Sequence, residues 1–423
     1  MKILESIKEE IRPKDYVVTK AIINEFVDKL KPKLKKIGAK AILGGSYAKG
    51  TAIRKESAEV DIFVAFNYTQ YEKKHGEISS ILARVLKSAR IKHSRLHGSR
   101  DYFNAYFKGI KFELVPILKI SKVGQALNIT DISSLHVKYV KSKISKSKKL
   151  ADEIRLAKAF AYGCNCYGAE SYIRGFSGYA LEILTIHYGS FSNLVRAATK
   201  WKEGQIIDPA RHYRKKEVIK EKLSESKLVS PLILIDPVDA SRNATAALNS
   251  EKFQAFISAS RKFLSRPREE YFEKYEINVE KLNKEAGSGK KLITVTLTLE
   301  KGKEDVVGAK LRKLYESLGK NLEINGFKTS RSEWQFIPSM QKAEFYFITT
   351  SKLPEYELHE GPPVRMQKHA HEFRSKWKKV KISRGRLYAR IKRKFSNPED
   401  LLRFLIKKRT SEFGIKSLLV RVR

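Results

Sequence analysis

Three acidic residues stand at positions where their side chains could meet and hold metal ions. Glu59 and Asp61 lie at the start of the apolar run EVDIFVAF, and Glu113 is the only acid in the segment KGIKFELVPIL. Residues i and i+2 of a strand point to the same face, so Glu59 and Asp61 present two carboxylates together. Such close like charges repel unless cations lie between them, and hard divalent ions prefer oxygen ligands.

These acids predict an in-line displacement at a phosphate group. With Glu113 on a neighbouring strand, three carboxylates could hold two ions, one activating an attacking hydroxyl and the other neutralising a triphosphate. The alternative is that all three are ordinary surface acids at solvated strand ends. Their occurrence together with a glycine turn favours the metal site over that alternative.

A glycine turn precedes the acids and could receive the phosphates. Residues 44–51 read GGSYAKGT. Gly44 and Gly45 allow the backbone to approach a triphosphate closely, and Ser46 and the turn amides can donate to phosphate oxygens. Lys49 adds a positive charge. A turn of this kind is weak evidence alone, and it gains weight beside the acids.

The hydrophobic pattern around the turn and the acids predicts a small α/β domain. Residues 1–35 carry helical periodicity, and a short strand is expected between them and the turn. Two apolar strands carry the acids, and a charged helix is expected between these strands at residues 73–89.

The rest of the chain predicts a helical region followed by an α+β module. Helical periodicity covers residues 150–202, and a further helical segment covers residues 215–227. The stretch EAGSGK at residues 285–290 predicts a linker or a long turn. Beyond it, the order strand, helix, strand, strand up to residue 350 predicts a helix on one face of a sheet. Residues 358–377 read as irregular and then helical.

Size and charge limit the classes of protein that fit. A chain of 423 residues is expected to form two to four domains. The 86 Lys and Arg residues exceed the 46 Asp and Glu residues, which gives a net charge of +40 and favours a polyanionic partner. The alternative is a lysine-rich composition that only solvates ordinary surfaces. Neither charge nor composition identifies the partner.

The sequence predicts a soluble, cytoplasmic protein with no membrane association. No apolar run approaches the roughly 20 residues needed to cross a bilayer. The only two cysteines, Cys164 and Cys166, have neither CxxC spacing nor enough partners for a disulfide framework, so we expect reduced packing residues. His359, His369 and His371 are close in sequence, but we expect them to lie on the protein surface and not to form a metal site.

Several motifs together resemble a known family. The GS turn, the ExDIFV strand and the later acid-bearing strand resemble the polymerase-β nucleotidyltransferase superfamily, which leaves the substrate open. Further segments closely resemble the archaeal-type (class I) CCA-adding tRNA nucleotidyltransferases: RLAKAFAYGCNCYGAE at residues 155–170, GFSGY at 175–179, HYGSF at 187–191, and IDPVD at 235–239 followed by Arg242 and Asn243.

The resemblance implies an α+β multidomain fold and a tRNA-end activity. It implies a nucleotidyltransferase head at residues 1–145, a helical neck at 146–258, and an α+β body with a tail at 259–423 that binds the tRNA acceptor arm. The implied activity is template-independent addition and repair of the 3′-terminal CCA with CTP and ATP, releasing pyrophosphate. Two Mg²⁺ ions and a homodimer are also implied.

The resemblance also assigns individual residues. Glu59, Asp61 and Glu113 match the catalytic metal ligands. Positions that bind the incoming nucleotide are matched by Gly45, Ser46, Lys49, His136, Lys158, Tyr167 and Arg242.

Each nucleotide-binding residue has an ordinary structural alternative. Lys158 could be a surface lysine, Tyr167 a core tyrosine and His136 a structural histidine. Arg242 has the rigid donor fork suited to reading bases, but it could instead pair with Asp239, three residues earlier.

The chain departs from the family pattern at three positions. Ala52 replaces a bulkier residue, Lys49 replaces the more usual arginine, and Glu113 replaces the more usual aspartate. Lys49 cannot make the bidentate contact of an arginine, and the longer Glu113 side chain changes the expected metal geometry.

Two rival functions stay open on sequence alone. One is a poly(A)-type polymerase acting on other RNA, and the other is a non-catalytic RNA-binding protein on the same scaffold. The three acids argue against the second. Contacts with the phosphates of an RNA partner are expected in the basic segments at residues 54–55, 141–149 and 384–394.

Overall fold

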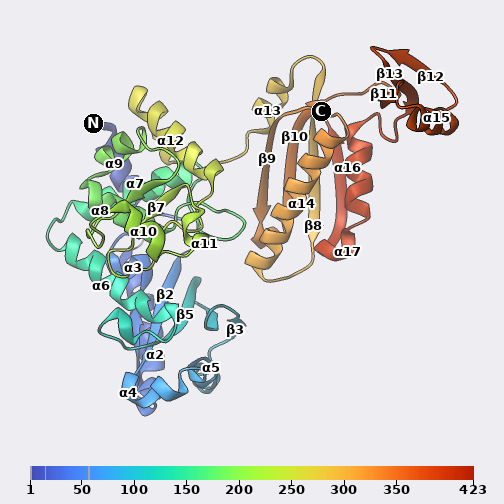
Figure 1. Cartoon of the computed structure of the whole chain (residues 1–423). Coiled ribbons are helices and arrows are strands. Elements are labelled where there is room, and N and C mark those ends of the chain that lie inside the picture. The colour runs from blue at the N-terminus through green and yellow to red at the C-terminus, as the bar shows by residue number, and fades with distance from the viewer. Residues whose placement is uncertain (1, 15, 56–57) are drawn as a thin grey trace. The chain divides into compact units, whose positions relative to one another are not determined.

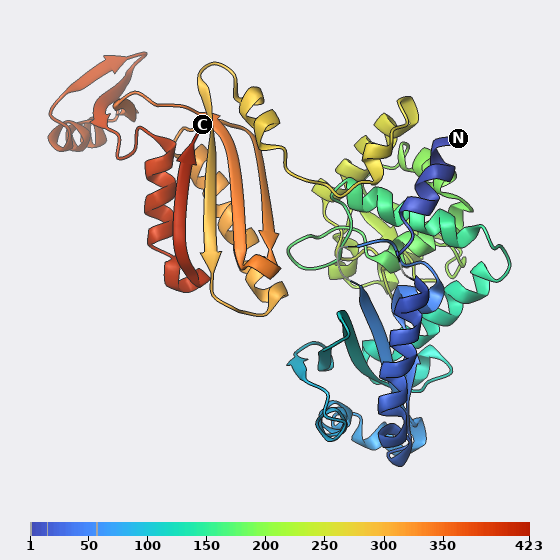
Figure 2. The same ribbon diagram turned by 180° about the vertical axis from the view of Figure 1, so that it is seen from behind.

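The computed structural model describes residues 2–14, 16–55 and 58–423 and divides the chain into two compact units. The first unit is Met1–Tyr275 and the second is Glu276–Arg423. Figures 1 and 2 show the two units from opposite sides.

A five-stranded mixed sheet forms the first part of unit 1. Its strand order is β1-β2-β5-β4-β3; β2 and β5 are parallel, and the other neighbours are antiparallel. The strands are β1 (Ala39–Leu43), β2 (Glu59–Phe66), β3 (His93–Leu96), β4 (Tyr102–Phe107) and β5 (Ile110–Leu118). The associated helices are α2 (Tyr16–Lys36), α3 (Gly45–Lys49), α4 (Tyr68–Tyr71) and α5 (Ile78–Ser88).

Both faces of this sheet are covered, which explains why β2 is apolar almost throughout. Side chains of α2 and α5 form one core with alternate residues of β2 and β5, and the Phe26 and Phe112 rings stack at 4.0 Å. The opposite face, with Phe63 and Val115, contacts Val137 of α6 (Ser133–Ile144). Because side chains alternate along a strand, Asp61 belongs to this second face.

The prediction of a single helix over residues 1–35 is wrong in one respect. The structure has two helices, α1 (Lys2–Glu10) and α2 (Tyr16–Lys36), with Pro13 between them. Proline has no amide hydrogen and disfavours helical geometry in the residue before it, so the first helix ends there. Residues 1 and 15, which the expected helix also included, lie outside the described part of the chain.

The second part of unit 1 is mainly helical, as predicted. Its remaining elements are α7 (Leu150–Gly163), α8 (Gly178–Tyr188), α9 (Phe191–Ala198), β6 (Gln205–Ile207), α10 (Lys216–Lys222), α11 (Glu225–Leu228), β7 (Leu232–Leu234) and α12 (Ser250–Ser265). Phe160 of α7 lies in an aromatic core whose rings include Phe191, Phe256 and Phe263. Cys164 and Cys166 are free thiols packed in the same core, as expected.

Unit 2 contains the predicted helix-on-sheet module. A four-stranded sheet has the order β14-β8-β10-β9, and α14 and α16 pack on one face of it. A three-stranded sheet, ordered β11-β13-β12, carries α15. The elements are α13 (Val279–Ala286), β8 (Lys290–Leu299), α14 (Glu304–Ile324), β9 (Thr329–Ile337), β10 (Lys342–Thr350), β11 (Tyr356–Pro363), α15 (Gln367–Lys376), β12 (Val380–Ser383), β13 (Arg386–Lys392), α16 (Pro398–Lys407), α17 (Thr410–Phe413) and β14 (Ile415–Val422).

One expectation for unit 2 needs correction, and another is confirmed in one of its two forms. Residues 358–363 belong to strand β11 because this segment pairs with β13, although the pairing is irregular between Glu360 and Pro363. Glycine and proline weaken a strand locally and are typical of such irregularities. Of the two interpretations of residues 285–290, the turn is confirmed: residues 287–289 connect α13 to β8 inside unit 2, and the two units divide after Tyr275. Among the described residues, no helix is long and apolar enough to cross a membrane.

Candidate active site

Asp61 and Glu113 face each other across the two parallel strands of the first sheet. They are direct register partners between β2 and β5. Burial raises the pKa of both carboxyls, and the charge of Asp61 adds to the effect on Glu113, whose pKa rises to about 7. The prediction that these acids meet on adjacent strands is confirmed, and the pair forms a site of concentrated negative charge.

Glu59 is turned toward cations instead. Its side chain is 49% exposed and lies 2.8 Å from Lys111 Nζ and 3.8 Å from Lys55 Nζ. Burial opposes ionisation of Glu59, but Lys111 and Lys55 outweigh that effect and lower its pKa. Lys111 is the register partner of Glu59 on β5, so the sheet itself supplies this competitor.

A divalent cation fits the Asp61 and Glu113 pair on chemical grounds. Both are oxygen donors, and the charge of Asp61 raises the pKa of Glu113, so a cation between them would relieve the repulsion. No group of three potential ligand side chains is preassembled within the described ranges. Glu59 would complete the expected set of three only after leaving Lys111.

The raised pKa of Glu113 predicts a pH-dependent stability. In EDTA, the Glu113→Gln variant should exceed the wild type in unfolding free energy by a margin that grows between pH 4.5 and about 7. The folded protein binds a proton more tightly than the unfolded chain here, so stability is lost as pH rises through the folded pKa, by on the order of 3 kcal/mol. Urea denaturation measures the margin, and Mg²⁺ should narrow it by binding the wild type. A margin that does not vary with pH would refute the interpretation.

Gly45 brings the turn directly against Asp61. Its φ is +54°, and a Cβ at this position would lie 1.6 Å from Asp61 Oδ2. The amide of Gly44 donates to the Asp61 carbonyl at 2.8 Å, which fixes the turn to the end of β2. The turn therefore needs glycine because a carboxylate occupies the space of a side chain.

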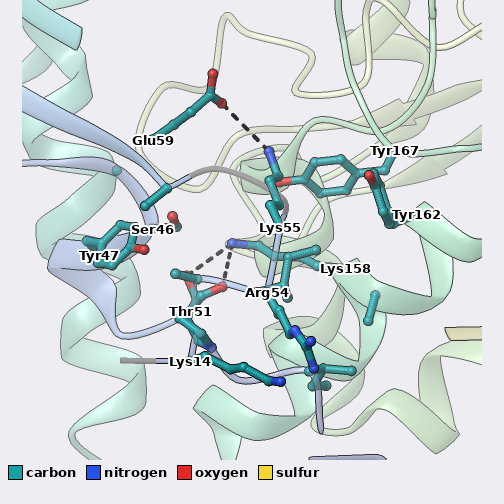
Figure 3. Close-up of a pocket in the computed structure, with 18 of the residues that line it drawn as sticks. Lys14, Ser46, Tyr47, Thr51, Arg54, Lys55, Glu59, Lys158, Tyr162 and Tyr167 are labelled. Atoms are coloured by element: carbon teal, nitrogen blue, oxygen red, sulfur yellow. Dashed lines mark hydrogen bonds and ion pairs between the residues drawn. The ribbon is translucent and has the colours of Figure 1, made fainter. Parts of the chain in front are cut away.

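A cavity of about 1000 Å³ opens beside the acids and the turn. Figure 3 shows part of its lining, including Ser46, Lys55, Lys158 and Tyr167. Of the residues that the sequence assigned to the site, those lining the cavity are Gly45, Ser46, Lys49, Glu59, Asp61, Glu113, Lys158 and Tyr167. His136 and Arg242 are not in this lining.

Lys49 and Lys158 share one buried carboxylate. Lys49 Nζ lies 2.6 Å from Oε2 of Glu182, and Lys158 Nζ lies 2.7 Å from its Oε1. Burial lowers the pKa of Lys158 to about 8, although Glu182 partly offsets this. The alternative of a surface lysine is therefore wrong for Lys158, whose side chain is only 2% exposed.

A second carboxylate, Asp236, holds His136 and Arg242. His136 Nε2 lies 2.9 Å and Arg242 Nη1 lies 2.7 Å from Asp236 Oδ2, while the Tyr179 hydroxyl donates to Oδ1 at 2.9 Å. Burial opposes the charge on Asp236, but His136, Arg242 and a backbone amide lower its pKa to about 2. Asp239, the expected competitor for Arg242, instead accepts hydrogen bonds from Ser241.

Tyr179 connects the two groups of residues. Its ring stacks on His136 at 4.2 Å between centroids, and the charges of Arg242 and Lys49 lie 5.7 and 5.8 Å from the ring centroid. Tyr179 also lines the cavity. His136 and Arg242 do not line the cavity themselves. They contact Tyr179, which does.

Glu182, Tyr179 and Asp236 were not predicted as site residues from the sequence. Tyr179 and Asp236 lay within the GFSGY and IDPVD motifs. Glu182 is the only acid of α8, whose sequence GYALEILTIHY is otherwise apolar or uncharged apart from His187. A single acid in an apolar helix was the available signal, because burying a charge is costly unless it has a partner.

Asp236 should be far more important to stability than Asp239. We expect Asp236→Asn to lower the unfolding free energy by roughly 3 kcal/mol, because it removes the buried counter-charge of the partly buried His136 and Arg242. Asp239→Asn is the matched control, since it weakens only local hydrogen bonds to Ser241 and should cost about 1 kcal/mol. Urea denaturation of both variants compares the two costs. Equal costs would show that Asp236 does not organise this part of the fold.

Three family models match consecutive parts of the chain. A second messenger oligonucleotide or dinucleotide synthetase domain matches residues 5–153, the second domain of tRNA nucleotidyltransferase matches residues 152–273, and the C-terminal domain of the CCA-adding enzyme matches residues 288–417. The second and third matches fall in units 1 and 2, respectively.

Similar proteins cover most of the chain. The CCA-adding enzyme of Nanoarchaeum equitans is 37% identical over 358 residues, which are 84% of each chain. That of Methanocaldococcus jannaschii is 30% identical over 96% of this chain and 90% of its own. Among solved structures, the Cid1 poly(U) polymerase covers 65% of this chain and 98% of its own with a TM-score of 0.51, and at 15% identity it supports the fold alone. The chain belongs to the family of CCA-adding enzymes.

Proposed function

We propose that this protein builds and repairs the 3′-terminal CCA of tRNA, using CTP and ATP and releasing pyrophosphate. The observation that carries the proposal is the register pair of Asp61 and Glu113 beside the Gly45 turn, in a chain whose relatives are CCA-adding enzymes. A non-catalytic RNA-binding protein has no need of two adjacent acids whose pKa values are both raised by burial.

In this reaction the acidic residues of the site would bind metal ions, and the turn and cavity residues would bind the phosphates. The 3′-hydroxyl oxygen of tRNA bonds to the α-phosphorus as the bond to the pyrophosphate breaks. Asp61 and Glu113 would hold divalent ions, with Glu59 as a third ligand once it leaves Lys111. Two Mg²⁺ ions would lower the pKa of the attacking hydroxyl and neutralise charge on the triphosphate. Ser46, Lys49 and the other cavity residues would orient the phosphates.

The base would be read by the group around Asp236. Arg242 presents a planar donor fork, and Asp236 and the Tyr179 ring fix its position. The net charge of +40 supports tRNA as the second substrate, because phosphate contacts dominate the affinity of proteins for nucleic acids. Cytoplasmic location, a homodimer and the division of unit 1 into head and neck stay predictions.

Addition assays test the proposal. Purified protein is incubated with tRNA lacking its CCA end and with CTP alone, ATP alone, or both nucleotides. We expect two C residues with CTP alone and a stop after CCA with both. Repeated A addition without C would instead identify a poly(A)-type enzyme, and absence of any addition would refute the catalytic function.

A further inference from the structure

Glu182 is a fully buried acid with no assigned role. It lies in the first turns of α8, its side chain is 0% exposed, and both carboxylate oxygens are used. Oε1 accepts from Lys158 Nζ at 2.7 Å and from Thr51 Oγ1 at 2.6 Å, and Oε2 accepts from Lys49 Nζ at 2.6 Å. Glu182 thus joins α8 and α7 to the end of the glycine turn.

The charges around Glu182 do not cancel. Two ammonium groups share one carboxylate, so the group carries a net positive charge at the cavity, where both lysines are lining residues. The lysines hold the pKa of Glu182 at about 2 against the effect of burial, so this acid stays ionised. A buried positive charge is costly unless a counter-ion balances it. Besides Asp61, whose pKa both lysines lower, a triphosphate is the anion that the proposed reaction brings to this cavity.

Lys49 and Lys158 differ in how firmly the protein holds their ammonium groups for binding a triphosphate. Lys158 Nζ also contacts Thr51 Oγ1 at 3.0 Å and the Thr51 carbonyl at 3.2 Å, so its position is fixed from several directions. Lys49 Nζ, by contrast, donates a hydrogen bond to Glu182 and lies over the Tyr179 ring. Glu182 therefore sets the position of both charges, although its own carboxylate is buried beneath them.

We propose that Glu182 is a positioning residue that holds Lys49 and Lys158 toward the triphosphate of the incoming nucleotide. This inference rests on the proposed function. Because CTP and ATP carry the same triphosphate, Glu182 would govern the binding of both nucleotides equally and would not affect the choice between C and A. A purely structural tie between α8 and the turn would affect stability and turnover without singling out the nucleotide.

The decisive variant is Glu182→Gln, which keeps the shape but cannot balance two ammonium groups. We expect the KM for CTP and ATP, and the inhibition constant of inorganic triphosphate, to rise together by about 10- to 100-fold, as for lost charge-assisted contacts. The KM for tRNA and the ratio of C to A addition should not change. Glu182→Asp, which retains the charge, should recover part of the loss.

Asp131→Asn is the matched control in the same unit. Asp131 is another fully buried carboxylate, bonded to Arg100 and to the Leu118 amide, and it is not in the cavity lining. We expect it to lower stability without raising the KM for either nucleotide. Should Glu182→Gln be too unstable to assay, Glu182→Asp takes its place: the shorter side chain should still raise the KM for both nucleotides and the inhibition constant of inorganic triphosphate together, with no change in the KM for tRNA.

The outcomes separate this inference from the proposed function. If Glu182→Gln lowers turnover and stability with no change in either the nucleotide KM or triphosphate inhibition, Glu182 is only structural. The same conclusion follows if Asp131→Asn raises the nucleotide KM equally. If the wild type itself binds neither CTP nor inorganic triphosphate, the proposed function has failed first.

Discussion

Replacing Asp61 by Asn is expected to reduce nucleotide addition by about 10³-fold or more, because a catalytic metal ion contributes several kcal/mol and each 1.36 kcal/mol is tenfold in rate. The same variant should be slightly more stable than the wild type in EDTA. Asp61 is buried opposite Glu113, so removing its charge relieves both desolvation and repulsion. Single-turnover addition of CMP to tRNA and urea denaturation measure the two effects.

This opposition between activity and stability distinguishes a catalytic role from a structural one. Active-site charges are commonly retained at a cost in stability. A variant that lost activity and stability together would indicate that Asp61 supports the fold. Undiminished addition in Asp61→Asn would overturn the assignment of the metal site.

Replacing Gly45 by Ala should be almost as damaging to catalysis. The new methyl group would lie 1.6 Å from Asp61 Oδ2, so the turn and the carboxylate cannot both keep their positions. Since a misplacement of about 1 Å can cost on the order of 100-fold in rate, we expect at least that loss in kcat. Addition assays at saturating CTP measure it.

Gly50→Ala provides the matched control. Gly50 has a similar φ of +68°, but nothing lies within 4 Å of the position of its Cβ. Both variants incur the left-handed backbone penalty of roughly 1–2 kcal/mol, and only Gly45→Ala also displaces Asp61. Equal activity in the two variants would show that backbone strain alone explains the effect.

Local patterns determined the elements that carry the chemistry. The alternation and apolar content of EVDIFVAF and KGIKFELVPIL predicted two strands, and the structure pairs them with Asp61 opposite Glu113. The helical region at residues 150–202 and the helix-on-sheet module of unit 2 were also predictable, because periodicity reflects which side chains are buried. The break at Pro13 was a local signal that the sequence analysis did not use.

The partners of the charged residues could not be predicted in the same way. Pairing β2 with β5 also brings Lys111 to Glu59, which leaves the expected set of three acids incomplete. Likewise Arg242 pairs with Asp236 and not with Asp239, which is closer to it in sequence. The segment is a turn, and a turn does not place side chains three residues apart on one face as a helix does.

By itself, the sequence determined the family and the acids, glycines and basic residues available for chemistry. Only the tertiary structure decided that Lys49 and Lys158, 109 positions apart, share the buried Glu182, and that His136 and Arg242 share Asp236. The physical reason is that secondary structure follows from short-range periodicity, whereas a buried charge takes whichever counter-charge packing brings within reach. That choice depends on contacts between elements distant in sequence.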